Sequence, residues 1–184
     1  MKTINKFIIE KLRLGKNNKN QEYNYYPKTR LELKELIYKL IEQRGENADL
    51  NDIDTSAITN MHKLFYESKF NGDISKWDVS NVEDMKSMFD SSSFDGDISE
   101  WDVSNVKTME AMFYESKFSG NNGDISKWDV SNVEHMGWMF CASKFNQDIS
   151  KWNTNNVTNM TDMFYQTPME KNPPQWFKEW DEKW

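Results

Sequence analysis

Residues 72–94 read GDISKWDVSNVEDMKSMFDSSSF, and residues 96–118 repeat them almost unchanged as GDISEWDVSNVKTMEAMFYESKF. A third copy occupies residues 123–145, and weaker copies lie at residues 48–70 and 147–164. Self-similarity at a fixed period is the signature of a repeat architecture. A unit this short can bury its apolar face only against a neighbouring unit, so we expect the five copies to stack.

Each unit divides into two halves with different hydrophobic patterns. Ile74, Trp77 and Val79 partly alternate with polar residues, which favours a short strand. Ser80 and Glu83 then form a capping box, which predicts the start of a short helix. The apolar stripe of this helix would be Val82, Met85, Met88 and Phe89. We therefore predict an α/β repeat solenoid whose coils each hold one short strand and one short helix, with the strands on the concave side because strands pack closer than helices.

The repeat motif also carries a family resemblance. The pattern W-D-V-S-N-V-x-x-M-x-x-M-F, present from Trp77 to Phe89 and from Trp101 to Phe113, resembles the BspA-type leucine-rich-repeat-like proteins of bacteria, which are also abundant among mycoplasma surface proteins and gut bacteriophages. The resemblance covers residues 48–167. It implies leucine-rich-repeat-like coils and a role in recognition or attachment, with no associated catalysis. The segment YYPKTRLELKELI before the first repeat is similar to the short versions of bacteroidetes and their phages.

The chain divides into three parts. Residues 1–47 are predicted to form an N-terminal helical segment, with helices at about 3–14 and 30–44, the second of which caps the first coil. Residues 168–184 form an aromatic C-terminal cap, which either covers the last coil or docks a partner. The five units of the solenoid between them span 48–71, 72–95, 96–122, 123–146 and 147–167.

Charge is unevenly distributed. Residues 1–47 hold 11 Lys+Arg against 6 Asp+Glu, a net of +5, and residues 48–184 hold 12 against 24, a net of −12. A repeat region with this much negative charge would repel phosphate groups. We therefore expect no direct contact with nucleic acid. The same charge suggests an alternative role as an acidic decoy that competes with nucleic acid for a basic site.

Localisation follows from cysteine usage and from apolar stretches. The lone Cys141 cannot form an internal disulfide, and no segment reaches the roughly 20 apolar residues that span a bilayer. The N-terminus is a poor signal peptide because charged residues interrupt its apolar positions. We expect a cytoplasmic protein of a bacterium or of an infected host cell, with the cell surface as the alternative.

Stacking would align equivalent charged residues in rows. The position before each tryptophan changes charge between units and should face solvent on the concave side, either as a recognition row or as a solvated face without a role. The aspartates after the tryptophans either accept backbone amides in a turn or form a calcium ladder. Asn81, Asn105, Asn132 and Asn156 are expected to bond the backbone of the next coil. The candidate partner-binding residues are Lys76, Asp78, Glu100, Asp102, Lys127, Asp129 and Lys151.

No motif carries catalysis, a metal or a cofactor, so we predict a non-enzymatic scaffold. The partner would be a macromolecule, most simply a protein, bound through the repeat array. A cell-surface adhesin is the second alternative beside the decoy.

Overall fold

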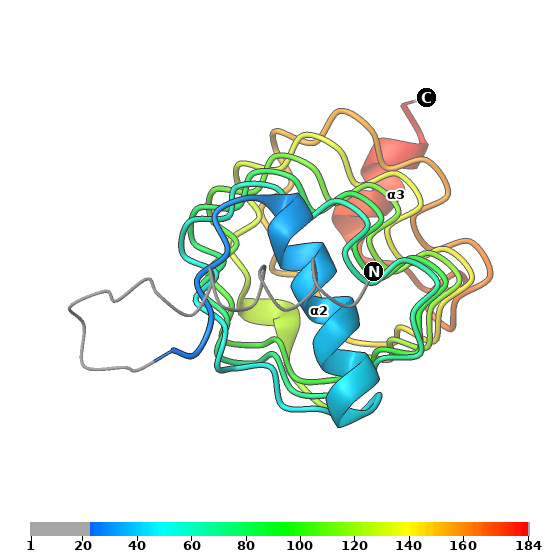
Figure 1. Ribbon diagram of the computed structural model, residues 1–184. Coiled ribbons are helices and arrows are strands. Elements are labelled where there is room, and N and C mark those ends of the chain that lie inside the picture. The colour runs from blue at the N-terminus through cyan, green and yellow to red at the C-terminus, as the bar shows by residue number, and fades with distance from the viewer. Residues whose placement is uncertain (1–22, 184) are drawn as a thin grey trace.

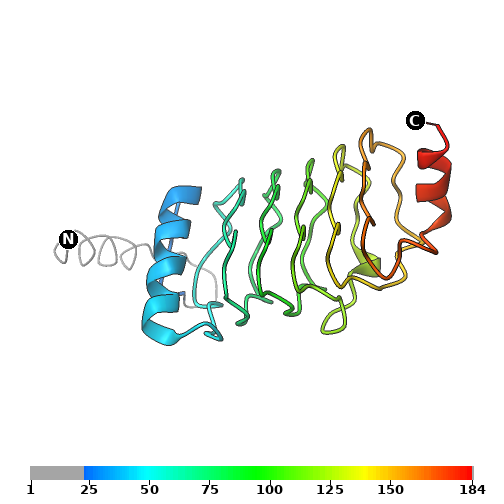
Figure 2. The same ribbon diagram turned by 90° about the vertical axis from the view of Figure 1, so that its right-hand side faces the viewer.

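The computed structural model describes residues 23–183, which form a stack of five coils with a helix at each end (Figures 1 and 2). Helix α2, Arg30–Arg44, covers the first coil, and helix α3, Gln175–Asp181, covers the last. The predicted helix at about 3–14 lies outside the described residues. We name the coils 1 to 5 in chain order, for residues 48–71, 72–95, 96–122, 123–146 and 147–167.

The predicted α/β repeat solenoid is wrong, because the coils contain neither the strand nor the α-helix expected of them. Within residues 23–183 the only α-helices are α2 and α3, and the coils hold one 3-10 turn, η1 at Ile125–Lys127. β-pairing there is limited to isolated parallel bridges. Since the curvature was predicted from strands packing closer than helices, the distinction between a concave strand side and a convex helix side no longer applies.

The predicted helix is replaced by a ladder of hydrogen bonds between coils. Ser87 and Ser91 have φ angles of +52° and +57°, which a right-handed helix excludes. Alternate amides of coil 2 instead donate to carbonyl oxygens of coil 3, at 2.7–3.0 Å. These pairs are Met85 to Thr108, Ser87 to Glu110, Phe89 to Met112 and Ser91 to Tyr114. The backbone is therefore satisfied by the neighbouring coil, and one parallel bridge on this face links each pair of successive coils.

The predicted strand is replaced by tight turns. In coil 2 the amide of Trp77 donates to the carbonyl oxygen of Ile74 at 3.1 Å, and that of Val82 donates to Val79 at 2.9 Å. The carboxylate of Asp73 accepts the amide two residues on, as short polar side chains do in turns. Bending toward the stack axis turns the apolar side chains of this segment inward without an extended strand.

Stacked phenylalanine rings form the centre of the core. Rings of successive coils lie 5.4–6.0 Å apart and within 12° of parallel, through Phe65, Phe89, Phe113, Phe140 and Phe164. A second phenylalanine in each of coils 1 to 4 lies against the first, with centroids 3.8–4.9 Å apart. Phe94, the second phenylalanine of coil 2, is fully buried.

A ladder of tryptophan indoles connects the coils. Each indole nitrogen donates to a carbonyl oxygen of the preceding coil, at 3.0–3.2 Å. The donors in coils 2 to 5 are Trp77, Trp101, Trp128 and Trp152. Trp176 of α3 continues the ladder by donating to Ile149 at 3.1 Å, and its ring stacks on Trp152.

The other end is closed by α2. Thr29 caps this helix by accepting the amide of Glu32 at 3.2 Å, and Gly45 ends it with φ +92°. Leu33, Leu36, Ile37 and Leu40 of α2 are buried in the common core. The two helices thus cover apolar ends that the terminal coils would otherwise expose.

Close approach between coils explains the glycine that opens coil 2. A Cβ added at Gly72 would overlap the carbonyl oxygen and the amide nitrogen of Ala48 in coil 1. We expect Gly72→Ala to lower the free energy of unfolding by about 2 kcal/mol, because the backbones must move apart. Gly45→Ala is the control, since no atom lies within 4 Å of its added Cβ and only the left-handed φ opposes it. Urea unfolding of both variants measures the two losses, and an unchanged stability of Gly72→Ala would show that the contact with Ala48 does not require glycine.

Candidate partner-binding surface

The seven predicted partner-binding residues are all exposed. Lys76, Glu100, Lys127 and Lys151 each precede a tryptophan of the indole ladder, so they recur once per coil at equivalent positions. The segment that carries them is a turn and not a strand. The structure therefore places these residues in one row on the surface, although not on a strand face.

The aspartates of this row are held by local hydrogen bonds. Asp78 accepts both the amide and the hydroxyl of Ser80, at 3.1 and 2.6 Å, and Asp102 binds Ser104 in the same way. Hydrogen bonds from the hydroxyl and the amide of Ser131 lower the pKa of Asp129. The prediction that these carboxylates accept backbone amides is confirmed. Among residues 23–183, no group of three or more His, Cys, Asp and Glu side chains is placed to hold a metal ion.

The asparagine ladder also forms, with a direction opposite to the one predicted. Each side-chain amide donates to a serine carbonyl oxygen in the preceding coil and not in the next one. The distances are 2.6–2.9 Å for Asn81, Asn105, Asn132 and Asn156. Together with the indoles, these side chains fix the register of the turns that present the charged row.

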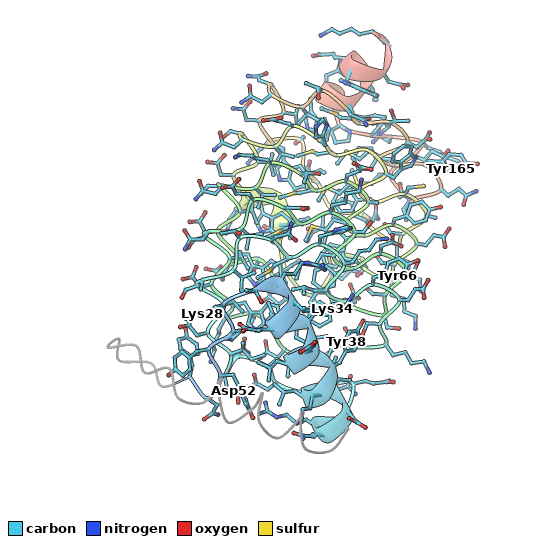
Figure 3. The ribbon with its side chains drawn as sticks, turned by 45° about the horizontal axis from the view of Figure 1, so that its top comes forward. Lys28, Lys34, Tyr38, Asp52, Tyr66 and Tyr165 are labelled. Carbon is cyan, nitrogen blue, oxygen red and sulfur yellow. The ribbon has the colours of Figure 1, made fainter. Side chains whose placement is uncertain are left out.

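A second row of side chains at the surface was not predicted, and in it Tyr66 and Tyr114 are half-buried. Tyr66, Tyr114 and Tyr165 occupy the same repeat position in coils 1, 3 and 5, and Figure 3 shows Tyr66 and Tyr165 on the same side of the stack. Trp138 of coil 4 is 36% exposed and Tyr165 is 50% exposed. A signal for this row is present in the sequence, since the tyrosines are separated by 48 and 51 residues, which is two units each time. We call these three tyrosines and Trp138 the aromatic edge.

The aromatic edge contains a hollow of about 310 Å³. Its lining comes from three successive coils: Asp90 of coil 2, Ala111 and Tyr114 of coil 3, and Trp138 of coil 4. Trp138 has φ +56°, a conformation that bulky residues adopt rarely, and its indole nitrogen donates to Asp162 at 3.2 Å. The small side chain of Ala111 leaves room between the larger neighbours.

Carboxylates give the aromatic edge a negative potential. A hydrogen bond to Glu67 raises the pKa of Tyr66, and the charges of Glu67, Asp90 and Glu115 add to it. A hydrogen bond to Glu115 likewise raises the pKa of Tyr114, with a further contribution from Asp90. Asp90 therefore acts on the tyrosines of both neighbouring coils.

A cationic side chain of the protein itself contacts an aromatic ring of this edge. The ammonium group of Lys63 lies 4.7 Å from the centre of the Tyr66 ring. A cation within about 6 Å of an aromatic ring face is attracted by the ring quadrupole. The edge thus combines ring faces with carboxylates, which is the environment that cationic side chains favour.

The aromatic C-terminus is packed against the last coil. Trp176, Phe177 and Trp180 are partly buried against the core, and Phe177 meets Phe164 edge to face at 5.0 Å. The segment therefore lies against the last coil. Its use as a partner-docking patch would require the helix to leave that coil.

The thiol of Cys141 is buried in coil 4. Its burial raises the pKa of the thiol, and the charges of Asp162, Glu115 and Glu170 raise this pKa further. No helix in the described part of the chain is long and apolar enough to cross a membrane.

Comparison with known proteins places most of the chain in a family. The model of a family described as "Mycoplasma protein of unknown function, DUF285" matches residues 33–122 and 117–182. This match is compatible with a BspA-like repeat family. No curated protein and no solved structure matches the chain.

Proposed function

The chain belongs to the family described as Mycoplasma protein of unknown function, DUF285, and since that description supplies no activity, we propose from the geometry that the protein is a non-enzymatic scaffold that binds a protein partner. The observation that carries this proposal is the row of exposed charges presented by the stack. Lys76, Lys127 and Lys151 project from turns that indole and asparagine bonds hold in register. A surface ordered before binding loses less entropy on binding, which favours recognition.

We propose further that the chain is a short BspA-type member of the kind found in bacteroidetes and their phages. Its support is the segment YYPKTRLELKELI, which leads into α2 directly before coil 1. We propose a cytoplasmic location, because the lone Cys141 is buried and free. Intact chain recovered outside unlysed cells would favour the adhesin instead.

Charge reversal in the row tests the scaffold. We expect the double variant Lys76→Glu and Lys127→Glu to reduce capture of the partner about tenfold, because a reversed charge meets the partner's complementary group with repulsion. The measurement is a pull-down from extract of the native host with quantitative mass spectrometry, wild type against variant.

The matched control reverses two exposed lysines elsewhere on the coils, Lys117→Glu and Lys144→Glu. Both double variants change the net charge equally, so an effect confined to the first pair assigns binding to the row. Equal capture by all three proteins would contradict the row as the binding surface. Failure to recover any partner specific to the wild type would contradict the scaffold itself.

The acidic decoy is the second candidate, and the net charge of −12 over residues 48–184 favours it. Its complexes would rest on attraction between surface charges, which salt screens. Binding of the recovered partner that persists at about 0.5 M salt would argue against the decoy.

A further inference from the structure

The aromatic edge is a surface separate from the charged row, and its composition indicates the kind of group it receives. Two aromatic side chains and one carboxylate line the hollow, and each comes from a different coil. The hollow therefore exists only while coils 2, 3 and 4 are stacked in register. No sequence segment by itself contains it.

We propose that this hollow binds an arginine side chain from a basic segment of the protein partner. The inference rests on the proposed scaffold function and adds the class of partner and the place where it docks. The planar guanidinium group stacks on aromatic faces and pairs with carboxylates, so Tyr114, Trp138 and Asp90 offer both contacts that it needs. Lys63 on Tyr66 shows the same pairing of cation and ring within the chain.

Charge complementarity identifies a basic occupant. The repeat region carries a net charge of −12, and the carboxylates of Glu67, Asp90 and Glu115 act on the half-buried tyrosines of this edge, Tyr66 and Tyr114. A neutral or acidic segment would gain nothing from these groups and would have to desolvate them. An arginine stacked here replaces water around Asp90 with an opposite charge.

The spacing of the edge indicates how such a segment lies. Tyr66, Tyr114 and Tyr165 are two coils apart, and the phenylalanine rings inside the stack advance 5.4–6.0 Å per coil. Two coils therefore correspond to roughly 11 Å, close to the rise of about 9 Å that one three-residue turn of a polyproline II segment spans. A segment that runs along the stack axis would bring every third side chain to an equivalent place.

The test uses the full chain and a defined probe. The probe is a short glycine–serine peptide with an arginine at every third residue, and its control carries citrulline, which has the same shape without the charge. We expect the arginine peptide to bind about tenfold more tightly than the citrulline peptide at low salt. Fluorescence anisotropy of the labelled peptides measures binding. The indole N–H signal of Trp138, assigned by its loss in Trp138→Phe, should shift on addition of the arginine peptide.

Two variants locate the site. Asp90→Asn should weaken binding of the arginine peptide about tenfold, whereas Asp148→Asn, which removes the same charge at an exposed position of coil 5 outside both rows, should leave binding unchanged. Tyr114→Ala should weaken it as well, with Tyr38→Ala on α2 as the control for loss of an exposed ring. If both asparagine variants weakened peptide binding equally, the loss of net charge would explain the weakening, and the proposal would be overturned. Binding of a neutral oligosaccharide at Trp138 in place of the peptide would overturn it too.

The tests distinguish failure of the arginine site from failure of the proposed scaffold function. If a host partner is captured through Lys76 and Lys127 while the arginine peptide fails to bind, the scaffold stands and this inference falls. If the peptide binds through Asp90 while no host partner is recovered, the hollow binds cationic side chains but the scaffold function lacks its partner.

Discussion

Phe113→Ala is expected to lower the free energy of unfolding by about 4 kcal/mol, because it removes the middle ring of the phenylalanine stack. Phe113 is fully buried, and its ring lies 5.5 Å from Phe89, 5.7 Å from Phe140 and 4.0 Å from Phe118. The coils above and below are held apart by their own hydrogen bonds, so they cannot close the cavity. Urea unfolding, followed by tryptophan fluorescence, measures the loss.

Two control variants separate the ring stack from general loss of an aromatic residue. Tyr38→Ala removes a ring that is 49% exposed on α2 and should change stability by less than about 0.5 kcal/mol (Figure 3). Phe113→Leu keeps an apolar side chain in the core and should cost about 1.5 kcal/mol. If Phe113→Ala cost no more than Phe113→Leu, the stack would not be the main source of stability that its geometry indicates.

The repeat itself was sufficient to predict which side chains are buried. Trp77, Phe89 and Phe94 recur at fixed positions, and each points into the stack as expected. The start of α2 was equally readable, because Thr29 and Glu32 have the spacing of a capping box and Thr29 accepts the amide of Glu32. These features depend on composition and on local chemistry, which the sequence contains.

The conformation of the backbone inside each coil was not readable in the same way. Val82, Met85 and Phe89 are spaced as they would be on one face of a helix. In the coils these residues are also buried, although alternate amides there bond to a neighbouring coil and the chain turns between them. The left-handed positions carry Ser87, Ala111 and other residues that are not glycine, so the usual sequence marker of positive φ is missing. Stacking of the coils provides the hydrogen bonds that hold these residues there.

The surface was predicted in part. The position before each tryptophan could be recognised as exposed because it lies beside an inward residue in every unit. The hollow could not be recognised, since Asp90, Tyr114 and Trp138 belong to different units and meet only after stacking. The tyrosine spacing of two units was visible, but spacing alone does not distinguish an exposed edge from a core row.

The C-terminal helix continues a pattern that the sequence also contains. Trp176 follows Trp152 by 24 residues, the same interval that separates Trp128 from Trp152. Its indole donates to the carbonyl oxygen of Ile149, which is the bond that every earlier tryptophan of the ladder makes to the preceding coil. Helix α3 has only 7 residues and is too short to be stable in isolation, so it depends on this contact.

Trp176→Ala should therefore release α3 and lower the free energy of unfolding by about 3 kcal/mol. This loss is smaller than the loss for a fully buried aromatic side chain, because Trp176 is only partly buried. The loss should concentrate at the end of the stack, where Trp152 and Phe164 would become exposed. Hydrogen exchange should become faster at the amides of coil 5 and remain slow at those of coil 3.

Trp176→Phe is the matched variant, because it keeps a ring that can stack on Trp152 and removes the indole N–H together with the smaller ring of the indole. It should cost about 1 kcal/mol, the value of one hydrogen bond to a carbonyl oxygen that is then left without its donor. Glu179→Ala, at an exposed position of α3, should leave exchange in coil 5 unchanged. Faster exchange throughout the stack in Trp176→Ala would mean that all five coils unfold as one unit, and that α3 caps the whole array and not its last coil alone.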